Sequence, residues 1–244
     1  MRRYGLIGYP LSHSFSQKYF TEKFQREQIA DCVYENFPLA DISEFSALIQ
    51  QHDDLCGLNV TIPYKEKVIP FLTEQSDVVK ATGACNCIKI NNGRLAGYNT
   101  DVIGFENSLK PLLQPHHTKA LVLGTGGAAK AVHYVLNKLG IAFTEVSRTP
   151  SKAAQIAYDK IGEASISEYQ LIINTSPVGM YPKVDECPPL PYQFLTSKHY
   201  LYDLVYNPAK TLFLQKGEAQ GAAVKNGHDM LIIQAEEGWR IWNS

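Results

Sequence analysis

The chain has 244 residues, of which 45% are hydrophobic and 19% are charged, and its formal net charge is −1. This length supports a substantial core in one or two domains, and the composition is ordinary for a globular protein. A charge so close to zero excludes nucleic acid as the main partner and argues against a membrane surface.

The N-terminus and the cysteines favour a cytoplasmic protein. Met1-Arg2-Arg3 resembles the start of a signal peptide, but Tyr9-Pro10 and the polar residues after it interrupt any apolar segment. No stretch approaches the roughly 20 apolar residues that cross a bilayer. The five cysteines are odd in number and irregularly spaced, which is typical of reduced thiols.

The first hundred residues predict strands that alternate with helices. We expect strands at 4–8, 32–37 and 55–60, and helices at about 15–29, 42–49 and 68–80. This alternation is typical of a layered, mostly parallel α/β sheet. A strand that ends at Ile90, the turn Asn91-Asn92-Gly93 and a return strand at 94–98 then predict a hairpin.

The stretch from Leu55 to Lys67 places polar side chains at the carboxyl end of a strand, where ligands of open α/β sheets bind. Asn59 and Thr61 end the apolar run, Pro63 indicates a corner into a helix, and Lys65 follows in the first turn. A cation there opposes the helix dipole, which indicates a role other than helix stability. The alternative is an ordinary solvated lysine.

Asn99-Thr100-Asp101 precedes a helix that we expect to reach about Leu113. Asp101 can cap this helix or stabilise its positive end, and it can also take part in catalysis. Both interpretations stay open at this point. The polar segment 113–117 is a candidate domain boundary, and its two histidines have no partners at the spacing of a zinc site.

The second half of the chain carries a dinucleotide-binding fingerprint. A strand at 119–123 leads into Gly124-Thr125-Gly126-Gly127-Ala128-Ala129, which opens a helix that ends at Gly140. The first glycine permits the tight turn, the second admits a pyrophosphate, and the third small residue packs helix on strand. Between a strand and a helix, this pattern predicts a nucleotide at the helix N-terminus.

The next strand, at 141–146, ends at Ser147-Arg148-Thr149 and is followed by Lys152. A carboxylate at this strand end would bind a ribose 2′-hydroxyl, whereas Arg148 suits a 2′-phosphate and therefore NADP. Glu145 is a carboxylate that would favour NAD instead, but it lies inside the strand and we expect it to face a solvated side. A surface charge is the alternative for Arg148.

Strands at 169–174 and 200–205 and a helix from Met230 to about Trp242 complete the pattern. The loops after both strands carry polar or aromatic groups where the nicotinamide half of a cofactor would lie. Asp203 lies inside a strand and receives no catalytic role. Gln234 shares a helix face with Met230, although a lone glutamine there is more often a surface residue.

Taken together, these blocks resemble the shikimate dehydrogenase family over nearly the whole chain and in the family's block order. The blocks that carry the resemblance are Gly8-Tyr9-Pro10 with Ser12-His13-Ser14 and Ser16, Asn59 to Lys65, Gly83 to Asn86, Asn99-Thr100-Asp101, Gly124 to Ala128, Ser147-Arg148-Thr149, Asn174 to Met180, Tyr206-Asn207-Pro208 and Gly227 to Gln234. The chain departs from the family pattern at Gln17, Cys85, Cys87, Ser147 and His228.

The resemblance implies a two-domain α/β protein: a mostly parallel α/β substrate-binding and catalytic domain at 1–101 and 226–244, and a Rossmann-type NADP-binding domain at 102–225. It implies Lys65 and Asp101 as the acid–base pair. The implied substrate-binding residues are Ser12, Ser14, Asn59, Thr61, Asn86, Tyr206 and Gln234. The implied cofactor-binding residues are Gly124, Thr125, Gly126, Gly127, Ala128, Ser147, Arg148, Thr149, Lys152, Thr175, Val205, Gly227 and Met230.

The implied reaction is the NADP-dependent interconversion of 3-dehydroshikimate and shikimate, a step toward aromatic amino acids. The implied partner is this small-molecule substrate, with no nucleic acid, membrane or metal, in a monomer or homodimer. A quinate or aminoshikimate dehydrogenase would share every block, so substrate choice within the superfamily stays open. A ligand sensor without turnover would need a DNA-binding segment or a damaged acid–base pair, and the sequence shows neither.

Overall fold

The computed structural model describes residues 1–11, 15–151 and 155–244. The chain divides into two compact units: unit 1 is Met1–Thr100 with Ala235–Ser244, and unit 2 is Asp101–Gln234. The predicted site residues Ser12, Ser14 and Lys152 lie outside the described residues. Within the described ranges, no helix combines the length and the apolar character that a membrane span requires.

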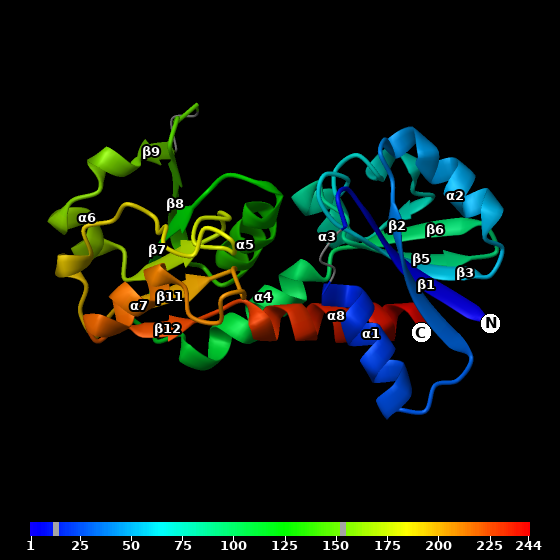
Figure 1. The fold of residues 1–244 in the computed structure, drawn as a ribbon. Helices are drawn as coiled ribbons and strands as arrows, with labels where there is room; N and C mark the ends of the chain where they lie inside the picture. Colours follow the sequence, from blue (N-terminus) through cyan, green and yellow to red (C-terminus); the bar gives the residue numbers. More distant parts are fainter. Residues whose placement is uncertain (12–14, 152–154) are drawn as a thin grey trace. The chain divides into compact units, whose positions relative to one another are not determined.

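Unit 1 is built on a six-stranded mixed sheet with the order β2-β1-β3-β5-β6-β4 (Figure 1). Its strands are β1 (Arg2–Gly8), β2 (Cys32–Pro38), β3 (Leu55–Val60), β4 (Glu74–Gln75), β5 (Cys87–Asn91) and β6 (Arg94–Tyr98). β1 pairs in parallel with β2 and β3, whereas β5 is antiparallel to β3 and β6. Asn92 (φ 49°) and Gly93 (φ 75°) both adopt left-handed backbone between β5 and β6, which confirms the predicted hairpin.

The helices of unit 1 are α1 (Phe15–Arg26), α2 (Phe45–Gln51) and α3 (Asp77–Thr82). The predicted helix at 68–80 is wrong: a 3-10 turn at Ile69–Phe71 is followed by β4, and only then by α3. Pro70 has no N–H for a helical ladder, and Ser76 begins α3 by accepting a hydrogen bond from the Val79 amide. Pro63 likewise opens a series of turns rather than a helix.

The C-terminal part of α8 (His228–Trp242) belongs to unit 1, where it completes an aromatic core. The Tyr4 and Trp242 rings stack with their centroids 4.9 Å apart. A Cβ atom at Gly57 would lie 2.4 Å from the Trp242 ring, so this glycine permits the helix to lie directly on β3. The aromatic stripe of the last helix is therefore core.

Unit 2 is built on six parallel strands with the order β12-β11-β10-β7-β8-β9 (Figure 1). They are β7 (Lys119–Leu123), β8 (Ala142–Ser147), β9 (Gln155–Ala157), β10 (Leu171–Asn174), β11 (Tyr200–Asp203) and β12 (Ala223–Lys225). Its helices are α4 (Asp101–Leu109), α5 (Gly127–Lys138), α6 (Glu163–Glu168), α7 (Leu212–Ala219) and the first part of α8.

The strand order of unit 2 reverses between β7 and β10, because β8 and β9 continue on one side of β7 while β10, β11 and β12 follow on the other. Such a switch point opens a crevice at the carboxyl ends of the two central strands. The loops after β7 and β10 are therefore the places to look for a bound nucleotide. The α/β fold class and the Rossmann-type pattern predicted from the sequence are confirmed.

Candidate functional site

The loop after β7 is shaped to approach an anion through its backbone. Gly124 has a φ of 114°, and a Cβ atom there would lie 2.8 Å from the Thr175 hydroxyl oxygen, so only glycine fits. A Cβ atom at Gly126 or Gly127 would meet nothing within 4 Å. No side chain caps the start of α5 among the described residues, so its first amide groups and its positive dipole end face this open space.

A cavity of about 640 Å³ extends from this glycine loop along the carboxyl ends of the strands of unit 2. Seven of the predicted cofactor-binding residues line it: Gly124, Thr125, Gly126, Ser147, Arg148, Thr149 and Thr175. Further lining residues come from the loop after β10, including Met180, Tyr181 and Lys183, and from Tyr158 just after β9. Among the predicted residues that are described, Gly127, Ala128, Val205, Gly227 and Met230 do not line it.

The end of β8 presents a cation rather than a carboxylate to this cavity. Arg148 is exposed and lines it, whereas Glu145 does not. The Glu145 carboxylate accepts a hydrogen bond from Gln155 Nε2 at 2.8 Å and lies 3.3 Å from His133 Nε2. The expectation that Glu145 faces a solvated side is wrong, because its side chain is only 16% exposed. A ribose 2′-phosphate fits this arrangement better than a free 2′-hydroxyl.

A buried carboxylate supports the loop after β10. Asp203 Oδ1 accepts hydrogen bonds from Asn174 Nδ2 (2.9 Å) and the Val205 amide (3.0 Å), and its Oδ2 accepts one from the Thr211 hydroxyl (2.6 Å). Asn174 Oδ1 in turn accepts from the Ser176 hydroxyl. Burial raises the pKa of Asp203 to about 6, against the effect of these three donors. The cavity wall therefore depends on a carboxylate removed from solvent.

The start of α8 packs closely on its neighbours in unit 2. A Cβ atom at Gly227 would lie 2.1 Å from the Leu204 carbonyl oxygen, so the backbone approach there requires glycine. A Cβ atom at Gly104 would likewise lie 2.7 Å from the Met230 carbonyl oxygen and 3.2 Å from the Gln234 Cβ atom. The structure thus places Gln234 against α4, the helix whose first residue is Asp101. Val205 and Gly227 are joined by a backbone hydrogen bond.

In unit 1, the half-buried Lys65 lies in the turns that follow β3. Its carbonyl oxygen accepts a hydrogen bond from the Cys85 amide at 2.7 Å. The next residue along, Asn86, accepts a hydrogen bond from the Thr100 amide at 2.7 Å and donates one to the Thr100 hydroxyl at 3.0 Å. The short segment 85–86, which leads into β5, therefore fixes the backbone of Lys65 and of the residue before Asp101.

Asn59 and Asn86 both use their side chains within unit 1. Asn59 Oδ1 accepts a hydrogen bond from the Tyr34 hydroxyl at 2.8 Å, and its Nδ2 donates to the Asn86 carbonyl oxygen at 3.4 Å. Both asparagines are buried. Asp101 is also buried and is the first residue of α4. Two other predicted substrate-binding residues are half-buried: Thr61 follows β3 in unit 1, and Tyr206 follows β11 in unit 2.

The structure adds residues that sequence patterns did not single out. Tyr158 follows a three-residue strand with no readable periodicity, and Tyr34 is one aromatic residue in an ordinary strand. Only the spatial partners of these tyrosines reveal them.

Cys85 and Cys87, which depart from the family pattern, are fully buried. The described residues contain no cluster of three or more potential metal ligands.

Comparison with known proteins finds similarity to shikimate dehydrogenases over nearly the whole chain. A family model for the shikimate dehydrogenase substrate binding domain matches residues 6–88. Shikimate dehydrogenase (NADP(+)) of Carboxydothermus hydrogenoformans is 39% identical over 253 residues, which cover 98% of this chain and 90% of that protein.

Solved structures agree with these sequence matches. Shikimate dehydrogenase from Aquifex aeolicus has a TM-score of 0.88 at 34% identity and covers 100% of this chain and 92% of its own. The enzyme from Thermus thermophilus, solved in complex with NADP(H) and shikimate, has a TM-score of 0.86 at 30% identity and covers 99% and 93%.

Proposed function

This chain belongs to the shikimate dehydrogenase family, and we propose that it catalyses the NADP-dependent interconversion of 3-dehydroshikimate and shikimate. The observation that carries the proposal furthest is the cavity that joins the Gly124–Gly126 loop to Arg148. In one continuous site, the backbone of this loop would bind a pyrophosphate and the Arg148 cation would bind a 2′-phosphate.

The cofactor would supply a hydride in the reductive direction. We propose that Gly124, Thr125 and Gly126 lie against its pyrophosphate and that Ser147, Arg148 and Thr149 bind its 2′-phosphate, because all six line the cavity. Lys152 would add a second cation nearby. Thr175 lies beside the glycine loop, since its hydroxyl donates a hydrogen bond to the carbonyl oxygen of Leu123.

The remaining predicted cofactor residues would act as supports for this site. Gly127 and Ala128 lie in the first turn of α5, and Val205, Gly227 and Met230 set the close packing at the start of α8. We propose that Tyr206 and Gln234 contact the substrate, with Ser12 and Ser14 as the hydroxyls for its carboxylate. Thr61, Asn59 and Asn86 would complete the site around the ring hydroxyls.

We propose that Lys65 and Asp101 form the acid–base pair. Lys65 would donate a proton to the oxygen that gains charge as the ketone is reduced, and Asp101 would accept a hydrogen bond from the same group. The segment 85–86 supports this assignment, because its hydrogen bonds hold the backbone of Lys65 and of Thr100, which precedes Asp101 in the chain. General acid–base assistance of this kind is typically worth about 10²–10⁴-fold.

Spectrophotometric assays test the function directly. Purified protein should oxidise shikimate with NADP⁺, as followed by NADPH absorbance, and should use NAD⁺ much less well. Parallel assays with quinate separate the relatives that share these blocks. No turnover with any of these pairs would refute the proposal and would favour a ligand sensor, whereas a higher kcat/KM for quinate would change the substrate assignment.

We also propose a cytoplasmic location and a monomer or homodimer. The reduced state expected of the five thiols supports the location. Light scattering coupled to gel filtration measures the oligomeric state, and a tetramer or larger assembly would contradict this expectation.

A further inference from the structure

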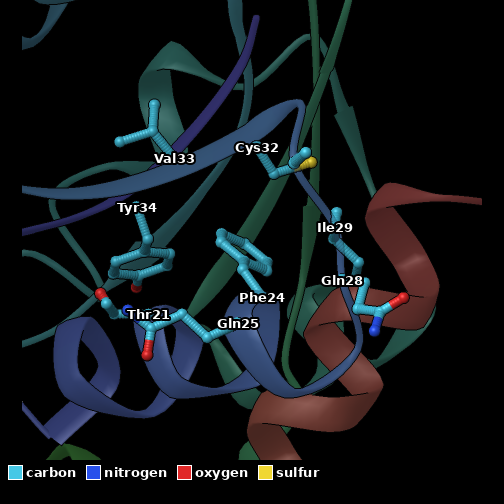
Figure 2. Close-up of a pocket in the computed structure, with 9 residues that line it drawn as sticks. Thr21, Phe24, Gln25, Gln28, Ile29, Cys32, Val33 and Tyr34 are labelled. Atoms are coloured by element: carbon cyan, nitrogen blue, oxygen red, sulfur yellow. The ribbon is translucent and has the colours of Figure 1, made fainter.

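Tyr34 carries a buried hydroxyl between separate segments of unit 1. Its ring projects from β2 toward α1, beside Phe24, and forms part of the wall of a cavity of about 440 Å³ (Figure 2). The ring stacks on Phe20 with the centroids 4.6 Å apart. The residue is 4% exposed, so the hydroxyl depends on protein partners for its hydrogen bonds.

Those partners belong to segments that the substrate site needs. The Tyr34 hydroxyl donates to Asn59 Oδ1 at 2.8 Å, at the end of β3 and six residues before Lys65. Burial raises the pKa of the Tyr34 phenol, and the nearby Ser16 side chain, in the first turn of α1, opposes this rise. The hydroxyl thus lies between the start of α1, which directly follows the segment of Ser12 and Ser14, and the end of β3.

The connection continues through Asn59. Because the Asn59 Oδ1 atom faces Tyr34, its Nδ2 atom faces the carbonyl oxygen of Asn86. The same carbonyl oxygen also accepts a hydrogen bond from the Val60 amide at 2.8 Å. The Asn86 side chain accepts a hydrogen bond from the Thr100 amide and donates one to the Thr100 hydroxyl. The adjacent Cys85 amide donates a hydrogen bond to the Lys65 carbonyl oxygen. Every group in this series is neutral, and every step lies within unit 1.

We propose that Tyr34 is a positioning residue of the substrate site: its hydroxyl sets the orientation of the Asn59 carboxamide and, through it, the segment 85–86 that holds Lys65 and Thr100. This inference rests on the proposed function of Lys65 and Asp101. Without the Tyr34 hydroxyl, the Asn59 oxygen is left buried without that donor, so the carboxamide rotates or shifts to find another. Rates are sensitive to small displacements of this kind.

Tyr34→Phe tests the proposal because it removes one oxygen atom and keeps the stacked ring. We expect kcat/KM for shikimate to fall about 10- to 100-fold, whereas KM for NADP⁺ stays within about twofold. Calorimetric titration of shikimate without cofactor should show weaker binding. A role confined to folding would lower the melting temperature without separating the two substrates.

Tyr4→Phe is the matched control. Tyr4 is as deeply buried and lies in the same aromatic cluster, and among the described residues its hydroxyl takes part in one hydrogen bond, which it accepts from Arg2 at 3.5 Å. We expect its kinetic constants to match those of the wild type. If Tyr34→Phe keeps the kcat/KM of Tyr4→Phe, or if both variants lose activity toward shikimate and NADP⁺ alike, the positioning role is refuted.

A double-mutant cycle with Asn59→Ala identifies the route. If Tyr34 acts through Asn59, adding Tyr34→Phe to Asn59→Ala should cost less than about twofold in kcat/KM, because the shared interaction is already lost. Fully multiplicative losses would overturn this route. The wild-type assay keeps the two proposals apart: no shikimate turnover refutes the function, whereas turnover with an unaffected Tyr34→Phe refutes only the positioning role.

Discussion

The two units carry their predicted site residues in different ways. In unit 2, seven predicted residues line one cavity, and several of them offer backbone or an exposed side chain to it. In unit 1, Asn59 and Asn86 are buried and bonded to other parts of the same unit. A sequence block can therefore mark either a surface that meets a ligand or the framework that holds such a surface in place.

The buried polar groups behind the two sites differ as well. The series from Tyr34 to Thr100 in unit 1 consists of hydroxyls, amides and carbonyls, which carry no charge near neutral pH. The corresponding support in unit 2 is the Asp203 carboxylate. Because only an ionisable support responds to pH, this part of the pH dependence of stability should come from unit 2.

Lys65→Ala should give the largest effect, because it removes the group proposed to transfer a proton. We expect kcat to fall about 10²–10⁴-fold, with the Kd for NADPH unchanged because the cofactor cavity lies in unit 2. Lys67→Ala is the control, since this exposed lysine lies in the same series of turns. Unchanged kcat in Lys65→Ala, or an equal loss in both variants, would end the acid–base assignment.

Asp203→Asn should separate the pH responses of the two supports. A raised pKa in the folded state means that the native protein binds the proton more tightly, so the stability that Asp203 contributes is greatest at low pH and is lost as pH rises toward and past 6. Relative to wild type, the variant should therefore gain about 2 kcal/mol of unfolding free energy between pH 4 and pH 7.

Urea unfolding of both proteins across this pH range measures the difference. The neighbouring Tyr192 and Tyr202 do not interfere, because burial raises the pKa of each phenol far above this range. Asp159→Asn, which changes an exposed carboxylate of the same unit, should follow the wild type. A constant difference between wild type and Asp203→Asn at all pH values would contradict a raised pKa at this site.

Local patterns predicted the regular parts of the fold well. The strand at 119–123 was placed to the residue, and the Asn92-Gly93 turn was identified because both residues tolerate left-handed backbone. The helix predicted at 68–80 failed because Pro70 interrupts an otherwise helical pattern. β9 and β12, with three residues each, are too short to carry a period.

The candidate site was predictable where chemistry follows directly from sequence order. Arg148 at the end of β8 was identified because a single strand end decides which ribose group it meets. The role of Tyr34 depends on Asn59, 25 residues away, and no local pattern encodes that distance. The burial of Glu145 beside His133 and Gln155 was not predicted for the same reason, because these partners come from α5 and from beyond β8.

Arg148→Ala sharpens the view that unit 2 presents exposed side chains to its ligand. Loss of a charge-assisted hydrogen bond to a phosphate should raise KM for NADPH about 10- to 100-fold and leave KM for shikimate and the activity with NADH nearly unchanged. Lys160→Ala removes a different exposed cation of unit 2 and should have no such effect. Equal losses with NADPH and NADH would contradict a 2′-phosphate role.

Tyr158→Phe should give the smallest effect and tests how far the 2′-phosphate site extends. Tyr158 lines the cavity with Arg148, and the positive charge of Arg148 opposes the rise that burial causes in the pKa of its phenol, so the two groups are close. Because Tyr158 lines the cavity, we expect its hydroxyl to donate a hydrogen bond to the 2′-phosphate. Because the donor is a neutral hydroxyl, its hydrogen bond to the phosphate should contribute less than that of Arg148, about 1 kcal/mol, so KM for NADPH should rise about two- to fivefold while KM for NADH stays constant.

The control for this small change is Tyr169→Phe, whose hydroxyl lies 3.0 Å from Thr144 Oγ1 and does not line the cavity. An equal KM for NADPH in both variants would confine Tyr158 to packing against the core of unit 2, where its ring already lies. A selective rise in KM for NADPH would instead extend the cofactor site of unit 2 to a residue that no sequence block contains. In that case the two units would differ less than their motifs suggest, because each would depend on a tyrosine hydroxyl that only the fold brings to its site.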